Sequence, residues 1–440
     1  MASFTEVPIL DLSLSRSPKT KPQFLEDLKR ALLEVGFLYI KNYGIDEKLT
    51  EEVIRLGKLF FELPEEEKLR LEMRNSPHFL GYSRLGNEIT SHATDWREQI
   101  DLATELPAPS PSEPRYRSLR GPNQWPSETL IPGFRETFDR YITLMGELSS
   151  EFTSLVAEAI GLPRDAFEKY YHGIGESRSG TKRQDKLKIV KYPDLGELGG
   201  GSNQGVGPHK DSMLSSYLLQ ASPHHSLQVQ NSSGDWIPCP PIAGTLVVAL
   251  GQGLEAITGG VVTSTTHRVL SPEAGEGPRF SIPFFQGISY DAEFEQMDVP
   301  EDVRRLKKEV LKSSARNEEK EVEMTFRKDL FGRLGEATLW NRVKSHTDVG
   351  ERFYPDLLAE VRKKNAELAA ASDNLSTGGE HPVQGRRRAP TIVLDRVDSS
   401  PSFGEDPGPD GSFERKEAFE KRKMDSTPDE TRVREETGVF

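Results

Sequence analysis

The sequence contains very little cysteine and no long apolar run. Cys239 is the one cysteine among 440 residues, so no internal disulfide can form and a disulfide-stabilised secreted scaffold is excluded. No apolar stretch approaches the roughly 18 residues that a membrane-spanning helix needs, and the first residues lack the basic and apolar segments of a signal peptide. These absences predict a protein of a reducing compartment, the cytoplasm, without a membrane partner.

An excess of positive charge is also lacking. Lysine and arginine number 57 against 70 aspartate and glutamate, and the net charge of −13 argues against nucleic acid as the main partner. We expect a small-molecule substrate and a monomeric chain. The last 70 residues, 371–440, contain only 12 Ile, Leu, Val and Phe, which is too few for a folded core, so we expect a disordered tail there.

The residues that are most informative begin at the head of a strand-like run, 206–220. His209 and Asp211 are two positions apart there, and side chains two apart on a strand share a face. His267 follows in a β-branched run. Two imidazoles and one carboxylate form the set that holds iron(II) and leaves three coordination positions open. The sequence therefore predicts His209, Asp211 and His267 as metal ligands.

The same spacing occurs a second time, without the context. His346 and Asp348 are also two apart, but only His381 lies downstream, in a polar segment with no strand pattern. The first pair is followed by His267 and then by Arg279-Phe-Ser281, both in β-branched or aromatic runs. The order of these features favours the first pair.

This order resembles the iron(II)/2-oxoglutarate-dependent dioxygenases of the isopenicillin N synthase-like family, whose pattern is His-x-Asp, a distal His and Arg-x-Ser. The resemblance extends from about Val7 to Gln286. It implies a mainly β fold with flanking helices, built on a double-stranded β-helix (jelly-roll, cupin-like) core with the metal at its mouth. It also implies iron(II), 2-oxoglutarate and O2, with release of succinate and CO2.

The resemblance assigns roles to residues near the metal. Arg279 has a planar fork that can take the far carboxylate of 2-oxoglutarate bidentately, and Ser281 shares its face and adds a hydroxyl donor. In the resembling enzymes, a tyrosine at the place of Tyr192 donates a hydrogen bond to the same carboxylate. The alternatives are a packed core tyrosine and a structural arginine paired with a protein carboxylate. No catalytic residue is expected beyond the metal ligands.

The expected function is oxidation of a small organic molecule, in secondary metabolism, by hydroxylation, desaturation or ring formation. One alternative is an oxidase of the isopenicillin N synthase type that uses no 2-oxoglutarate, in which Arg279 and Ser281 bind a substrate carboxylate. Another is a cupin-like binding protein with a vestigial metal site. Lys210 and Gln252 stand where the family more often has Thr or Ser and Asp, which leaves the substrate class open.

The chain divides into five regions by pattern. These are an N-terminal α/β region (1–105), a proline-rich loop with helices (106–180), the catalytic jelly roll (181–290), C-terminal helices (291–370) and the tail (371–440). A helix is expected over 22–35, ended by a left-handed Gly36, and another helix is expected to begin at Asp46. We also expect strands over 95–101, 187–192, 263–270 and 279–285, and a loop over 196–207. The last two of these strands are expected to be antiparallel neighbours.

Overall fold

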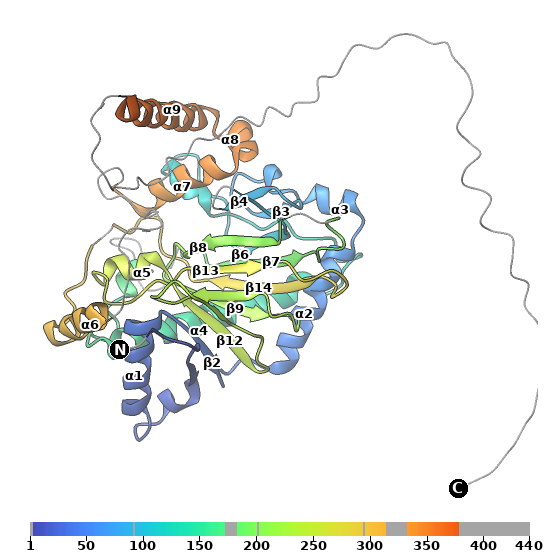
Figure 1. The fold of residues 1–440 in the computed structure, drawn as a ribbon. Helices are drawn as coiled ribbons and strands as arrows, with labels where there is room; N and C mark the ends of the chain where they lie inside the picture. Colours follow the sequence, from blue (N-terminus) through green and yellow to red (C-terminus); the bar gives the residue numbers. More distant parts are fainter. Residues whose placement is uncertain are drawn as a thin grey trace, which may run out of the picture. The chain divides into compact units, whose positions relative to one another are not determined.

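The computed structural model describes residues 3–90, 93–171, 183–199, 202–293, 295–313 and 332–377 (Figure 1). Residues up to Ala371 form one compact unit. The region expected to be a disordered tail lies outside the described residues from position 378 onward. None of the described helices is long and apolar enough to cross a membrane.

Two sheets make up the core of this unit, and every pairing in them is antiparallel except that of β1 with β2. The large sheet has the order β1 (Ile9–Asp11), β2 (Phe37–Lys41), β12 (Thr245–Leu250), β9 (Ser215–Gln220), β14 (Arg279–Phe285), β7 (Lys186–Tyr192), β6 (Glu98–Ala103) and β3 (Gly81–Ser83). The small sheet has the order β11 (Trp236–Pro238), β10 (Leu227–Gln230), β13 (His267–Leu270) and β8 (Gln204–His209). A separate ribbon pairs β4 (Glu88–Thr90) with β5 (Ala93–Asp95).

Strand β7 shows how the large sheet separates two cores. Leu187 and Ile189 belong to a cluster with the helices, whereas Val190 and Tyr192 belong to a cluster with the small sheet. This alternation follows from the two-residue period of a strand. The face of the large sheet that meets the small sheet is called the inner face below, and the face that meets the helices the outer face.

Helices cover the outer face of the large sheet. Helix α2 (Glu47–Glu62) begins at Asp46, whose carboxylate accepts a hydrogen bond from the Lys48 amide, and it packs beside α4 (Phe134–Ala159) and β14 (Figure 1). Helix α1 (Lys21–Arg30) continues through a π turn that ends at Gly36, in the left-handed conformation expected there. A side chain at Gly36 would meet the Thr263 carbonyl at 2.1 Å, so glycine is required.

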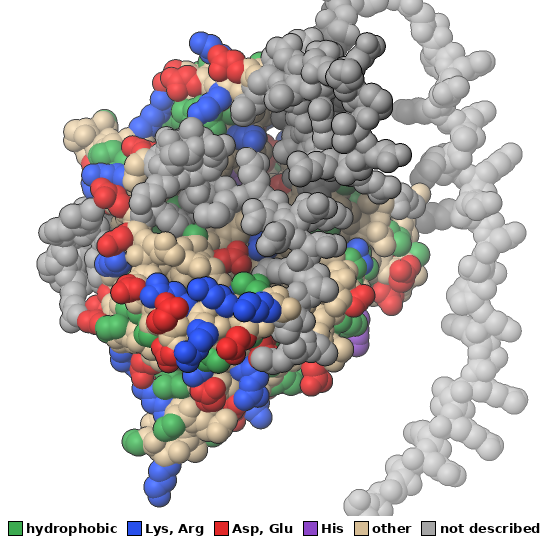
Figure 2. Space-filling model, turned by 60° about the vertical axis from the view of Figure 1, so that its left-hand side comes forward, with side chains coloured by type: hydrophobic (Ala, Val, Ile, Leu, Met, Phe, Trp, Pro, Cys, Tyr) green, Lys and Arg blue, Asp and Glu red, His purple; other side chains and the backbone are tan. Residues whose placement is uncertain are grey.

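The C-terminal helices pack against the N-terminal half of the unit. Leu339 and Val343 of α7 join a buried cluster with Phe79 and Tyr116. The remaining helices are α3 (Glu65–Arg70), α5 (Gln252–Ile257), α6 (Glu301–Ser313), α7 (Leu334–Ser345), α8 (Thr347–Phe353) and α9 (Pro355–Thr377). On the face of the molecule in Figure 2, acidic and basic side chains alternate and the hydrophobic ones are scattered.

Three expectations about strands are wrong. β13 and β14 are not neighbours, because β13 lies in the small sheet and β14 in the large one, as consecutive strands of a jelly roll alternate between sheets. The strand expected over 95–101 is interrupted at Trp96 and Arg97, where β5 leaves for the ribbon and β6 begins. The loop expected over 196–207 already contains the first residues of β8, which starts at Gln204.

Candidate metal centre

His209, Asp211 and His267 come together at one end of the small sheet. His209 is the last residue of β8, His267 is the first of β13, and the two are direct partners in the antiparallel register. Asp211 lies beyond the end of β8, in the connection to β9. The expectation that His209 and Asp211 share the face of one strand is therefore wrong. The chain leaves the small sheet for the large one at this point, so β8 must end.

The backbone around Asp211 is fixed by the turn before α5. The Asp211 carbonyl accepts a hydrogen bond of 2.7 Å from the Gln252 amide. Gly251, next to it, lies so close to this connection that a side chain would meet the Met213 carbonyl at 1.9 Å. This close approach holds Asp211 beside the two histidines without a strand.

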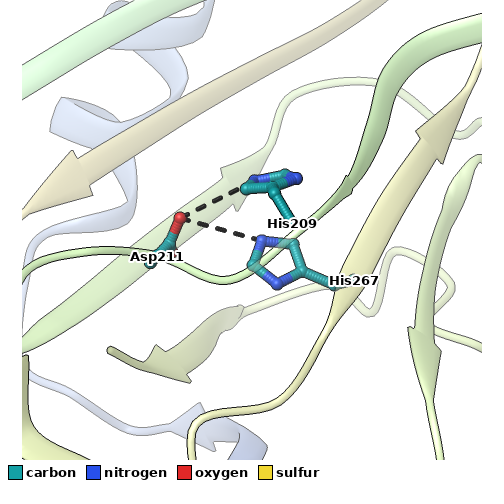
Figure 3. A group of neighbouring side chains, drawn as sticks. All are labelled: His209, Asp211 and His267. Carbon is teal, nitrogen blue, oxygen red and sulfur yellow. Dashed lines mark ion pairs between the residues drawn. The ribbon is translucent and has the colours of Figure 1, made fainter. Parts of the chain in front are cut away.

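The three side chains converge on one point (Figure 3). Oδ1 of Asp211 lies 3.7 Å from Nε2 of His209 and 3.8 Å from Nε2 of His267, and one ligand atom from each residue fits within 4.8 Å. Nδ1 of His209 lies 2.8 Å from the Gly207 carbonyl, and Nδ1 of His267 lies 3.2 Å from the Thr265 carbonyl. With Nδ1–H donating to a carbonyl, each Nε2 keeps its lone pair for a metal.

The electrostatics of the site suit a neutral imidazole. Burial, together with the nearby His267, lowers the pKa of His209 to about 4, although Asp211 acts in the opposite direction. A neutral imidazole is the form that binds a metal. Two imidazoles and one carboxylate, with no thiolate, are the donor set of non-haem iron(II) sites that keep open positions. The residues therefore fit iron(II).

Arg279 lies on the inner face of β14, beside Tyr192 and without a carboxylate partner among the described residues. Its side chain is 1% exposed, and neither Nη1 nor Nη2 finds a hydrogen-bond acceptor in the described part of the chain. It pairs in register with Tyr192, whose ring centre lies 4.9 Å from the guanidinium carbon. Burial lowers the pKa of Arg279, and Tyr192 opposes that shift. Two buried guanidinium nitrogens that lack an acceptor can donate a pair of hydrogen bonds to the carboxylate of a ligand.

Ser281 and Tyr192 lie next to Arg279 on the inner face of the large sheet. Ser281, 2% exposed, lies two residues from Arg279 and so on the same face of β14. Among the described residues, Arg279 forms no ion pair with a carboxylate, which is what a purely structural arginine would need. The site thus fits a dicarboxylate held at its far end.

A second polar region on the inner face was not found from the sequence. Glu88, Gln99, Asp101 and Lys188 form a hydrogen-bonded group with Arg97. The polar sequence of β6 gave no signal of this, because it has the composition of an exposed segment, yet the strand is buried throughout. The second His-x-Asp motif holds no metal-like cluster in the described residues, but its histidine lies beside Glu88.

Comparison with known proteins identifies the family. Two family models match, the N-terminal domain described as non-haem dioxygenase in morphine synthesis over residues 7–128 and the 2OG-Fe(II) oxygenase superfamily over residues 185–288. The 2-oxoglutarate-dependent dioxygenase frbJ of Dothideomycetidae sp. (strain 11243) is 59% identical over 86% of this chain and 100% of that protein. A homoarginine-6-hydroxylase of Glycine max is 31% identical over 67% of this chain and 89% of its own. The chain belongs to the 2OG-Fe(II) oxygenase superfamily.

Solved structures agree with this assignment. A 2OG-Fe(II) oxygenase family protein from Caulobacter crescentus is 26% identical, with a TM-score of 0.56 over 67% of this chain and 90% of that one. A Neurospora crassa protein in complex with alpha-KG and 5-formyluracil is 25% identical, with a TM-score of 0.55 over 68% and 90%. The expected jelly-roll fold and family are confirmed, and the protein is a dioxygenase that uses iron(II), 2-oxoglutarate and O2 on a small molecule.

Proposed function

We propose that His209, Asp211 and His267 hold the iron, and that Arg279, Ser281 and Tyr192 hold 2-oxoglutarate. The observation that carries the second part is the buried guanidinium of Arg279 with two unpartnered Nη atoms. Leaving such a charge buried and unpaired is costly, so a site that keeps it is built for an anion. The hydroxyl of Ser281 adds a donor on the same face.

Each residue has a physical task in this arrangement. The Gly207 and Thr265 carbonyls orient the imidazoles of His209 and His267, so both Nε2 atoms face the metal position. Arg279 fixes the far end of 2-oxoglutarate, which leaves its 2-oxo acid end to reach the iron. Together with O2, bound iron(II) and 2-oxoglutarate would supply the oxidising chemistry that removes hydrogen from the substrate. Succinate and CO2 would be released.

The inner face around these residues limits access of water. Val206 and Val269 of the small sheet and Val190 of the large sheet are buried beside Tyr192 in one apolar cluster. A low-dielectric surrounding strengthens the attraction between the guanidinium and a carboxylate. It also protects a reactive site from side reactions with solvent.

Succinate formation tests the proposal and separates it from the oxidase alternative. Protein supplied with iron(II), O2 and labelled 2-oxoglutarate should form labelled succinate, and Asp211→Ala should form none. An oxidase that uses Arg279 for a substrate carboxylate would form no succinate. The relatives named as 2-oxoglutarate-dependent dioxygenases support the first outcome.

The further expectations from the sequence stay part of this proposal. They are a monomeric chain in the cytoplasm without nucleic-acid or membrane partners, a role in secondary metabolism, and the five regions with boundaries near 105, 180, 290 and 370. Scattered hydrophobic side chains on the face in Figure 2 support a monomer. Light scattering on the eluted protein measures the oligomeric state, and imaging of a tagged chain gives the compartment.

A further inference from the structure

Strands β6 and β7 carry polar side chains on the inner face of the large sheet. Val190 and Tyr192 of β7 pack toward the small sheet, so the two-residue period places Lys188 on that face as well. Gln99 pairs with Val190 and Asp101 pairs with Lys188, so these residues of β6 share the face. The same face of β2 and β12 is apolar. The inner face is thus apolar at β2 and β12 and carries polar side chains from β14 through β7 to β6.

A network of charges connects these side chains. The guanidinium of Arg97, just before β6, bonds to Glu88 and lies 3.3 Å from Asp95. Nε2 of the Gln99 side chain donates hydrogen bonds of 2.9 Å to Glu88 and 2.8 Å to Asp101. Positively charged hydrogen-bond donors and negatively charged acceptors therefore lie together on the inner face.

Three groups of this network keep unused hydrogen-bonding capacity. Among the residues that the structure describes, Nε of Arg97 and Oε1 of Gln99 are buried and have no hydrogen-bond partner, and Gln99 is only 1% exposed. The Lys188 ammonium lies 3.4 Å from Asp101 and 3.7 Å from Glu88, too loose for a saturated ion pair. A network that served folding alone would satisfy its buried atoms. One free donor and one free acceptor instead match a ligand that presents both.

The network adjoins the metal centre. Oδ1 of Asp95 accepts a hydrogen bond of 3.1 Å from the amide of Gly207, two residues before His209. Glu88 and His346 also line a cavity of about 240 Å³ between the β3–β4 region and the junction of α7 and α8. Of the residues in the network, Glu88 alone lines that cavity.

Both signs of charge persist at neutral pH. Burial opposes the charge on Glu88, but Arg97 and Lys188 outweigh it and hold its pKa well below the usual range. Burial also opposes the charge on Arg97, and Glu88 outweighs it, so the pKa of Arg97 is raised. An uncharged apolar substrate would have to cover these charges without compensating them, which is costly.

We propose that the substrate is a small zwitterion of the amino-acid class, which carries a carboxylate and a cationic nitrogen. Arg97 and Lys188 receive the carboxylate, while Glu88, Asp101 and Oε1 of Gln99 receive the cationic nitrogen. This inference rests on the proposed function, because the substrate must lie beside the iron held by His209. The polar side chains on the inner face of β6 and β7, namely Gln99, Asp101 and Lys188, are called the polar wall below. In this proposal the polar wall determines which substrate binds.

Full-length protein loaded anaerobically with iron(II) and 2-oxoglutarate tests this inference by calorimetry. The probes are L-arginine, L-lysine, L-glutamine and L-leucine, with the uncharged flavanone naringenin as the apolar probe. We expect at least one amino acid to bind and naringenin not to bind. Glu88→Gln and Asp101→Asn should weaken the binding of that amino acid by about ten- to a hundredfold, the usual range for a hydrogen bond to a charged group.

Glu98→Gln is the matched control. Glu98 lies on the same strand but on the outer face, where it pairs with Lys68 at 3.0 Å and with Lys191 at 3.2 Å. Its substitution removes a comparable ion pair and should leave the affinity unchanged. Variants are compared only where they retain the visible absorbance band that 2-oxoglutarate produces with iron(II), which shows that the metal site is folded.

Several outcomes would overturn the inference, and they differ in what else they overturn. If wild-type protein forms no such band, the proposed function itself fails and the inference with it. If the band forms but no amino acid binds, or if naringenin binds instead, the co-substrate assignment stands and the zwitterion assignment is wrong. Equal amino-acid affinity in wild type, Glu88→Gln and Asp101→Asn would also contradict it.

Discussion

The two faces of β7 are equally hidden from water but differ in chemistry. On the outer face, Leu187 and Ile189 are both 0% exposed among the helices. On the inner face, Tyr192 is 4% exposed, and Lys188 lies on the same side of the strand. The polar groups of the outer face, Lys191 and Glu98, pair with each other at 3.2 Å, whereas the inner face meets groups with unsatisfied hydrogen-bonding atoms. Burial alone therefore does not separate core from site, but unmet hydrogen-bonding capacity does.

Strand β14 repeats the contrast. Ile282 and Phe284 pack outward into the helical cluster, while Arg279 and Ser281 face inward. One strand thus serves stability with alternate residues and the chemistry with the others. The following substitutions test this division, in order of decreasing expected effect.

Removal of a metal ligand should have the largest effect. His267→Ala removes one of the three proposed ligands. Loss of a residue that only hydrogen-bonds to a ligand already lowers metal affinity by about 10- to 100-fold, so we expect the iron(II) affinity of His267→Ala to fall by more than that. Metal content after dialysis and succinate formation measure it. The control is His224→Ala, because His224 contacts Ser222 and the Glu276 carbonyl instead of the metal site. Full iron binding by His267→Ala would refute the ligand set.

Removal of the inward guanidinium should weaken 2-oxoglutarate. Arg279→Gln is expected to lower its affinity by about thirtyfold or more, as expected when one partner of a buried charge pair is lost. Arg279→Lys should give an intermediate value, because it keeps the charge but not the fork. Calorimetric titration with 2-oxoglutarate, in the presence of iron(II), gives the dissociation constant for each variant. Arg268→Gln is the control, since that guanidinium stacks 4.0 Å from the Trp236 ring; equal effects at positions 268 and 279 would argue against the anchor.

Substitutions at adjacent residues of β7 should lower the free energy of unfolding by different amounts. Ile189→Ala, on the outer face, should lower the free energy of unfolding by about 2–5 kcal/mol and leave 2-oxoglutarate affinity intact. Lys188→Met, on the inner face, should lower it by only about 1 kcal/mol, because its ion pairs are loose. Urea denaturation measures both changes. A larger loss for Lys188→Met than for Ile189→Ala would show that the polar wall serves folding.

The last prediction concerns pH. Burial and the nearby Arg342 lower the pKa of His346 to about 4, although Glu88 opposes this. As pH falls from 6.5 toward 4, the unfolded chain binds a proton that the folded chain excludes, so stability is lost as pH falls. Between pH 7 and pH 5 the loss amounts to about 2 kcal/mol.

His346→Asn should reduce this dependence. Urea denaturation of the metal-free protein at pH 7 and pH 5 compares the two chains, and the carboxylates titrate mainly below this range. An identical loss in wild type and variant would mean that His346 is not buried as a neutral group.

Local sequence patterns predicted much of the fold. The alternation in 187–192, the cap at Asp46 and the glycine at position 36 each determine their own neighbourhood, and the structure confirms all three. Partner choice was harder, because a period of two identifies a strand but not its sheet. That is why β13 and β14 were wrongly expected to be neighbours.

The candidate site shows the same limit. The order of the metal-binding motif identified residues that the structure brings together, although the predicted reason for His209 and Asp211, a shared strand face, was wrong. The polar wall went unnoticed because Glu98-Gln-Ile-Asp101 has the composition of an exposed segment. Only its pairing with β7 shows that Gln99 and Asp101 are buried on the inner face.

Anaerobic visible absorbance of the metal-free protein, titrated with iron(II) and then with 2-oxoglutarate, tests the central claim most directly. The account predicts a weak charge-transfer band that requires both components, is absent from His209→Ala, and needs a much higher 2-oxoglutarate concentration in Arg279→Gln. Iron binding without such a band would show that the 2-oxo acid does not reach the metal. A band of equal affinity in Arg279→Gln would contradict the role of the inner face.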